Sequence, residues 1–184
     1  MKGTVFVEFM EHVESRYGLD VLEAVIAAAE GGLATGGAYT SVGNYPHEEL
    51  LELATALCKV SGESLEHLLD DFAMSMMRAF ERMHPEFFSD EQDLFDFFLT
   101  LESRIHADVR KIYPDARPPL ILTRRMADDC LELAYQSARP LAPLAIALAR
   151  AAGQKFGQAI VLTVLMQSED HRSLRLQVRR QTPD

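Results

Sequence analysis

Apolar side chains recur every three or four positions along most of the first two thirds of the chain, a spacing typical of amphipathic helices. The first apolar stripe passes through Val5, Phe9 and Val13. Further helices are predicted over residues 19–32, 47–62, 64–85 and 89–114. The last of them opens with Ser89 and Gln92 in the spacing of a capping box. The N-terminal part is therefore expected to be helical.

The hydrophobic period changes after residue 119. Residues 120–137 contain alternating apolar and polar positions, which predict a β-hairpin. Residues 141–157 predict a helix whose early prolines suit a first turn, and closing strands are expected over 159–166 and 173–180. Helices followed by antiparallel strands indicate an α+β fold. A single domain over residues 1–184 is predicted.

Charge and composition exclude several classes of function. The formal net charge is −10, and no basic stripe with interleaved aromatics is present, so no nucleic-acid partner is expected. No stretch reaches the roughly 18 apolar residues of a membrane span, and Glu8 and Glu11 interrupt any signal-peptide pattern. Cys58 and Cys130 are far apart and form no zinc or disulfide pattern. We expect a cytoplasmic protein without membrane association.

The usual catalytic motifs are absent from the sequence. The glycine-rich segment 31–46 lacks both GKS/GKT and GxGxxG, so a connecting loop is favoured over phosphate binding. Neither GxSxG nor HExxH occurs, and no enzymatic activity is expected. Among the histidines, His106 stands out because it lies in mid-helix on a second apolar flank. On pattern alone it reads either as a structural histidine or as a ligand.

Three strong hydrogen-bonding side chains follow one another at every second position: Tyr135, Ser137 and Arg139. In an extended chain they would share one face, roughly 6.5–7 Å apart. A guanidinium with two hydroxyls suits a carboxylate group, although a solvated strand end is the alternative.

His106, the segment that ends at Pro119, and the Tyr135-x-Ser137-x-Arg139 element together resemble the heme-nitric oxide/oxygen binding (H-NOX) family. This family is the bacterial relative of the heme domain of soluble guanylate cyclase. The resemblance covers nearly the whole chain and includes the opening "MKG" and the "AYTSVGNY" segment. It implies a distal helical subdomain (about residues 1–63) and a proximal subdomain (about 64–184), with heme b between them.

The resemblance also implies roles for individual residues. His106 matches the proximal iron ligand, and Pro119 matches the proline that presses on the porphyrin. Tyr135, Ser137 and Arg139 match the residues that hold the propionates. Further residues match the distal wall: Val5, Phe9, Met76, Phe80 and Leu144.

The distal side bears on which gas is bound. Oxygen-binding members carry a tyrosine five residues after the arginine, where this chain has Leu144. The resemblance therefore implies a nitric oxide sensor, with carbon monoxide as a further ligand. Binding would break the iron–His106 bond and change the conformation. The signalling partner would be a histidine kinase or a diguanylate cyclase/phosphodiesterase.

Two alternatives stay open on the sequence. One is an oxygen- or redox-sensing heme domain of the same fold, and the other is a heme-free helical interaction domain. A subgroup of the family binds zinc near its C-terminus, but the segment around His171 has no cysteines, so no zinc is expected.

Overall fold

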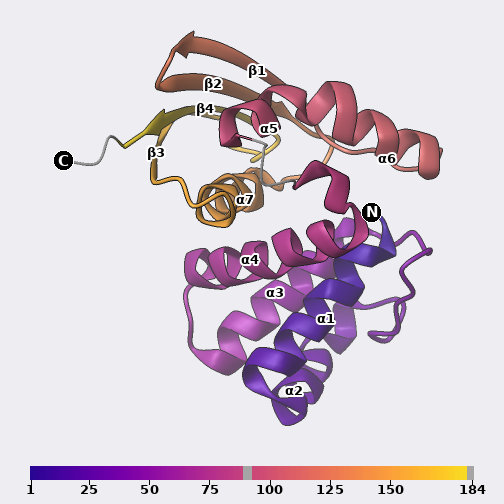
Figure 1. The fold of residues 1–184 in the computed structure, drawn as a ribbon. Coiled ribbons are helices and arrows are strands. Elements are labelled where there is room, and N and C mark those ends of the chain that lie inside the picture. Colours follow the sequence, from indigo (N-terminus) through magenta and orange to yellow (C-terminus); the bar gives the residue numbers. More distant parts are fainter. Residues whose placement is uncertain (89–92, 182–184) are drawn as a thin grey trace. The chain divides into compact units, whose positions relative to one another are not determined.

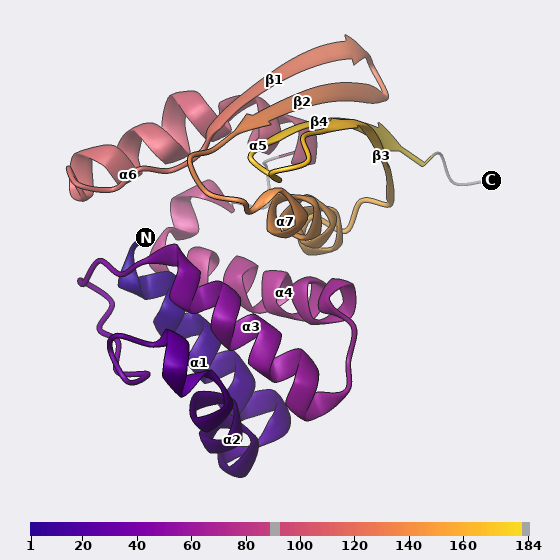
Figure 2. The same cartoon turned by 180° about the vertical axis from the view of Figure 1, so that it is seen from behind.

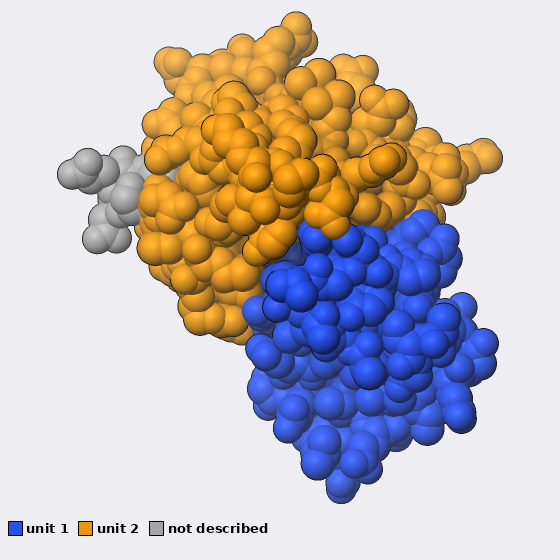
Figure 3. Space-filling view, turned by 90° about the vertical axis from the view of Figure 1, so that its right-hand side faces the viewer, with its two compact units in different colours: residues 1–76 blue, residues 77–184 orange. Residues whose placement is uncertain are grey.

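The computed structural model describes residues 1–88 and 93–181. The chain divides into two compact units, residues 1–76 and 77–184, which Figure 3 colours separately. The boundary lies inside one helix and differs in position from the predicted division near residue 63, which concerns functional subdomains and stays a prediction. The predicted α+β fold is confirmed, with helices first and an antiparallel sheet later (Figure 1).

Unit 1 is helical. Its elements are α1 (Gly3–Tyr17), α2 (Leu19–Ala29), the short η1 (Glu30–Gly32), α3 (His47–Ser61) and the first part of α4 (Leu65–Met83). Gly18 (φ 91°) and Gly62 (φ 76°) end α1 and α3 with backbone angles that favour glycine. Helix α2 packs against both α1 and α3. Two of the three residues of the apolar stripe predicted for α1, Phe9 and Val13, are buried, and Val5 is partly exposed.

The glycine-rich loop between η1 and α3 is hydrogen-bonded to the start of α1. The backbone N–H groups of Gly3 and Thr4 donate to the carbonyls of Gly43 and Ser41, at 2.9 and 3.1 Å. An added Cβ at Gly3 would lie 1.8 Å from a loop carbonyl oxygen, so only glycine fits there. The loop therefore holds the N-terminal end of α1.

A buried carboxylate fastens the same loop to α3. Glu49 is 2% exposed, and its Oε2 accepts hydrogen bonds from the hydroxyls of Thr35 (2.7 Å) and Tyr39 (2.8 Å). The ring of Tyr39 stacks on Phe6 of α1, with centroids 4.5 Å apart. Loop, α1 and α3 thus share one polar anchor and one aromatic contact.

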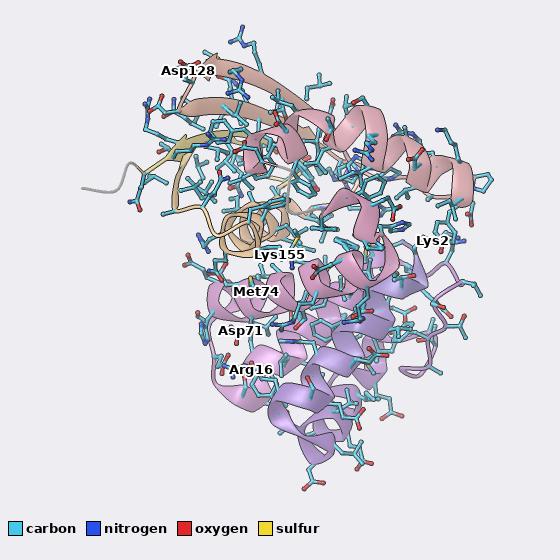
Figure 4. All side chains as sticks on the ribbon, viewed as in Figure 1. Lys2, Arg16, Asp71, Met74, Asp128 and Lys155 are labelled. Atoms are coloured by element: carbon cyan, nitrogen blue, oxygen red, sulfur yellow. The ribbon has the colours of Figure 1, made fainter. Side chains whose placement is uncertain are left out.

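An ion pair joins α1 to α4 within unit 1, and a hydrogen bond joins α1 to the segment just before α4. Arg16 Nε lies 2.6 Å from Asp71 Oδ2, and both residues are labelled in Figure 4. Tyr17 donates to Glu63 Oε2 at 2.8 Å, and His67 lies close to both carboxylates. Glu63, His67 and Asp71 have ligand atoms within 4.8 Å of one another, but Arg16 and Tyr17 already pair with the two carboxylates. This cluster is a network that holds helices together.

Unit 2 contains the remainder of α4, then η2 (Pro85–Phe87), α5 (Leu94–Thr100), η3 (Leu101–His106) and α6 (Ala107–Ile112), followed by β1 (Leu120–Ala127), β2 (Cys130–Gln136), α7 (Ala142–Lys155), β3 (Ile160–Gln167) and β4 (Ser173–Arg180). The antiparallel sheet has the order β1-β2-β4-β3, and α7 packs against β3 and β4 (Figure 2). The predicted hairpin, closing strands and intervening helix are all present.

Alternation along the two central strands builds the core of unit 2. Leu133 pairs with Leu176, and Tyr135 pairs with Leu174. These four side chains are at most 5% exposed, while intervening residues such as Arg175 face outward. Apolar side chains at every second position therefore fix the strand register, because a one-residue slip would expose them.

Helix α5 begins at a capping residue. The side chain of Asp93 accepts a hydrogen bond from the backbone N–H of Phe95 (2.8 Å) and another from Gln158 (3.0 Å), and it pairs with Arg180 at the end of β4. Burial alone would raise the pKa of Asp93, but these partners lower it overall. The predicted capping box at Ser89 and Gln92 lies outside the described residues.

None of the helices in the described part of the chain combines the length and the apolar run that a transmembrane segment requires.

Candidate functional site

His106 ends a π-helical turn. The sequence predicted a continuous α-helix here, but η3 is a π-helix between α5 and α6, and it contacts β1. Such turns are rare and are frequent at functional sites. The His106 side chain is 13% exposed, and its Nδ1 lies 3.0 Å from Glu102 Oε2. The carboxylate engages one ring nitrogen and leaves Nε2 as the nitrogen available to a metal.

Glu102 is held by two further donors. Its Oε1 accepts from Arg110 Nη2 at 2.9 Å, and its Oε2 accepts from the backbone N–H of Ile121 at 3.2 Å. Burial alone would raise the pKa of Glu102, but the hydrogen bonds from His106, Ile121 and Arg110 lower it overall. The carboxylate is therefore ionised at neutral pH and accepts the His106 N–H.

The imidazole of His106 is kept neutral. Burial lowers its pKa below the ordinary value, and this effect outweighs the hydrogen bond that His106 donates to Glu102, which raises the pKa. The backbone of Pro119 also raises this pKa, as the smallest of the contributions. A neutral imidazole is the form that binds metals.

Tyr135, Ser137 and Arg139 lie together near the end of β2. Tyr135 is 5% exposed, and burial raises the pKa of its phenol, while the hydrogen bond with Ser137 and the charge of Arg139 lower it. Ser137 Oγ accepts the backbone N–H of Arg139 at 3.0 Å. One guanidinium and two hydroxyls are thus gathered within five residues of chain.

The way these three residues are gathered differs from the prediction. Strand β2 ends at Gln136, so Ser137 and Arg139 do not share a strand face with Tyr135. The Ser137 hydroxyl takes the N–H of Arg139, and Leu141 N–H donates to the carbonyl of Arg139 at 2.9 Å. A side chain that bonds to nearby backbone competes with strand pairing. A turn therefore brings the three side chains together.

The residues predicted for the distal wall come from three helices. Val5 and Phe9 lie on α1, Met76 and Phe80 on α4, and Leu144 on α7. Phe9, Met76 and Leu144 are buried, at 1%, 4% and 7% exposure. Within unit 1, Phe9 meets Phe72 edge to face, with centroids 5.2 Å apart. None of the five side chains carries a hydrogen-bond donor, and their distal role stays a prediction.

Sequence reasoning missed Glu102. Its spacing of four residues before His106 was the available signal, because residues i and i+4 are neighbours on a helix. The bond to Ile121 carries no sequence signal, since 19 residues separate the two groups.

The donor set fits an iron porphyrin. A largely buried, neutral imidazole is a suitable iron ligand, and its second nitrogen donates to a carboxylate, as is common for metal-bound histidines. Arg139, Ser137 and Tyr135 supply the charged and hydroxyl donors that propionate carboxylates need. All these groups lie in unit 2.

Comparisons with known proteins point the same way. The Haem-NO-binding family profile matches residues 2–164. The Fe(II) unliganded H-NOX protein from K. algicida has a similar structure, with a TM-score of 0.89, 27% identity, and coverage of 100% of this chain and 98% of that chain. No curated protein sequence matches the chain.

Two more distant structures share the fold. A variant of an H-NOX protein from S. oneidensis in the Fe(II) ligation state has a TM-score of 0.87 at 20% identity, covering 100% of this chain and 98% of that one. An oxygen-binding H-NOX domain related to soluble guanylate cyclases has a TM-score of 0.79 at 19% identity, covering 100% and 96%.

Proposed function

The chain belongs to the haem-NO-binding (H-NOX) family of heme-based gas sensors, and from this premise we propose that it detects nitric oxide. The observation that carries the proposal is the neutral, largely buried imidazole of His106 with its Nδ1 hydrogen-bonded to Glu102. We assign His106 as the residue that would bind the iron of heme b, and Tyr135, Ser137 and Arg139 as the residues that would bind its propionates. Pro119, two residues before the Ile121 that Glu102 binds, contacts the porphyrin in this assignment.

The choice of gas rests on the distal residues. Bound dioxygen is polarised and needs a hydrogen-bond donor, whereas nitric oxide binds ferrous iron strongly without one. Val5, Phe9, Met76, Phe80 and Leu144 offer no donor. An apolar distal wall of this composition favours nitric oxide, and carbon monoxide as a second ligand, over oxygen.

Signalling follows from the fate of His106. If these residues hold ferrous heme, the heme would supply an iron that binds nitric oxide, and His106 would be the protein ligand released from that iron. His106 ends η3, which contacts β1, so release of the imidazole frees a helix that is bonded to a strand. The two conformations differ in the contacts of η3, and this difference shifts their populations.

The output is regulation of a separate partner rather than catalysis. H-NOX domains are sensors, and we propose that this chain is not an enzyme and that it controls a histidine kinase or a cyclic-di-GMP enzyme. Its formal net charge of −10 is suited to a partner with a basic docking patch.

The experiment is anaerobic spectroscopy of the purified protein, as isolated and with nitric oxide. We expect a histidine-ligated ferrous heme, loss of the histidine on addition of nitric oxide, and no stable oxygen complex in air. His106→Gly should bind heme only weakly until imidazole is added, and the rescued protein should not change the activity of the partner on nitric oxide binding. A colourless protein would favour the heme-free interaction domain. A stable oxygen complex would favour the oxygen sensor.

A further inference from the structure

We propose that Glu102 is a positioning residue that sets the strength of the iron–histidine bond through the Nδ1 proton of His106 and couples release of His106 to strand β1. This inference rests on the proposed function and deepens it.

The contact has the geometry of a charge-assisted hydrogen bond. His106 Nδ1 and Glu102 Oε2 are 3.0 Å apart, and the two side chains are 13% and 23% exposed. A bond shielded from water in this way is stronger than one at an open surface. The spacing of four residues places both groups on the same side of η3.

The carboxylate is oriented from three directions. Arg110 Nη2 bonds to Oε1, while the His106 ring and the Ile121 N–H both bond to Oε2. The side chain of Glu102 therefore cannot rotate away without losing several bonds. Rigid support of this kind is what distinguishes a tuning contact from a surface ion pair.

A carboxylate acceptor changes what His106 can do as a ligand. When the Nδ1 proton is drawn toward a negative oxygen, electron density rises at Nε2, and Nε2 becomes a stronger donor to a metal. The proton stays on Nδ1, so no bond is broken in this step. Glu102 is therefore expected to strengthen the bond between the iron and His106, so that the histidine stays bound until nitric oxide binds.

The third bond gives Glu102 a second role. Ile121 belongs to β1, an edge strand of the sheet. Its N–H donates to Glu102 Oε2, the same oxygen that accepts from His106. Movement of η3 away from its ligand-free position must stretch or break this bond. Glu102 thus links the state of His106 to the position of an edge strand.

The test uses resonance Raman spectroscopy of the ferrous, unliganded protein. In Glu102→Gln, which keeps the shape but removes the charge, we expect a lower iron–histidine stretching frequency and a higher heme reduction potential. Loss of the histidine after addition of nitric oxide should be faster, on the order of 10-fold. The matched control is Glu132→Gln, since Glu132 pairs with Arg175 at 3.0 Å but lies on β2. The control should leave all three quantities unchanged.

A second measurement does not depend on the stability of Glu102→Gln alone. In His106→Gly the missing ring is supplied by added imidazole, which can donate an N–H to Glu102, or by 1-methylimidazole, which cannot. We expect tighter binding of imidazole, on the order of 10-fold, and a smaller preference in the His106→Gly/Glu102→Gln double variant.

The outcomes separate the two proposals. If the ferrous protein shows no iron–histidine band at all, the proposed function fails and the inference fails with it. If the band is present but Glu102→Gln leaves its frequency, the reduction potential and the histidine loss as in the parent, only the inference is overturned. Equal binding of the two imidazoles in both backgrounds would overturn it as well.

Discussion

The guanidinium of Arg139 donates a hydrogen bond to the backbone carbonyl of Arg117, 2.9 Å away and 22 residues earlier in the chain. This bond connects the turn after β2 to the segment that leads to Pro119. A guanidinium has five N–H donors, so one bond to the backbone leaves others for a carboxylate. The Arg139 side chain, which is proposed to bind a propionate, is therefore oriented by a hydrogen bond to the backbone of Arg117.

We expect Arg139→Met to weaken the retention of heme. The variant removes the charge-assisted bonds of the guanidinium, each worth about 1.5–3 kcal/mol, so heme should be lost about 10- to 100-fold faster. The rate of heme transfer to an excess of apomyoglobin measures this effect. Arg139→Lys keeps the charge, and its rate of heme loss should lie between those of the parent protein and Arg139→Met. Equal rates for all three proteins would contradict the assignment.

Leu144→Tyr is expected to create oxygen affinity. A phenol at this position supplies the donor that polarised dioxygen needs, and a hydrogen bond of this kind is worth about 1–2 kcal/mol, or roughly tenfold in affinity. Absorption spectra of the ferrous protein in air measure the gain. Leu144→Phe adds the ring without the hydroxyl and should not bind oxygen. If Phe and Tyr behave alike, the gas selectivity does not arise from the donor.

Glu49→Ala should destabilise unit 1. It removes the shared acceptor of the Thr35 and Tyr39 hydroxyls in a site that is 2% exposed, at a cost of about 2–4 kcal/mol. Glu49→Gln keeps an acceptor oxygen, so its free energy of unfolding should decrease less than that of Glu49→Ala. Urea unfolding gives both values, and the exposed Glu52→Ala on the same helix serves as the control, with an expected change within about 0.5 kcal/mol.

Ionisation of Tyr39 should lower the free energy of unfolding at alkaline pH. Burial, with help from Glu49, raises its pKa from the ordinary 10.0 to about 12. The folded state therefore favours the neutral phenol, and this contribution is present below pH 10 and lost as the pH rises toward 12. In Tyr39→Phe the decline over this range should be shallower. Tyr17, whose pKa is also raised by burial to about 12, accounts for a remaining slope. An unchanged pH profile would count against the Tyr39–Glu49 contact.

The sequence was sufficient for elements whose signal is local. Alternation around Leu131, Leu133 and Tyr135 predicted the hairpin, and the same residues are buried in the sheet. The helix predicted over residues 47–62 ends at Gly62, whose backbone angle is one that other residues avoid.

Other features could not be read from local patterns. The apolar spacing around Leu101 and Ile105 is compatible with an ordinary α-helix, and it hides the π turn. Ile112, an apolar residue in the same predicted helix, is 54% exposed. The alternating pattern predicts Ser137 as a further strand residue. In the structure β2 ends at Gln136, and the Ser137 hydroxyl accepts the backbone N–H of Arg139. In each case a contact between groups outside the repeating pattern decides the geometry.

The π turn amounts to one extra residue inserted in a helical stretch that runs from Leu94 to Ile112. Deleting a residue between Leu101 and Ile105 would restore the α period and carry His106 around the axis by about 100°. An alignment that opens a one-residue gap here therefore equates helices that point their histidines in different directions. Evolutionary comparisons across this helix should be anchored at His106 and extended outward from it.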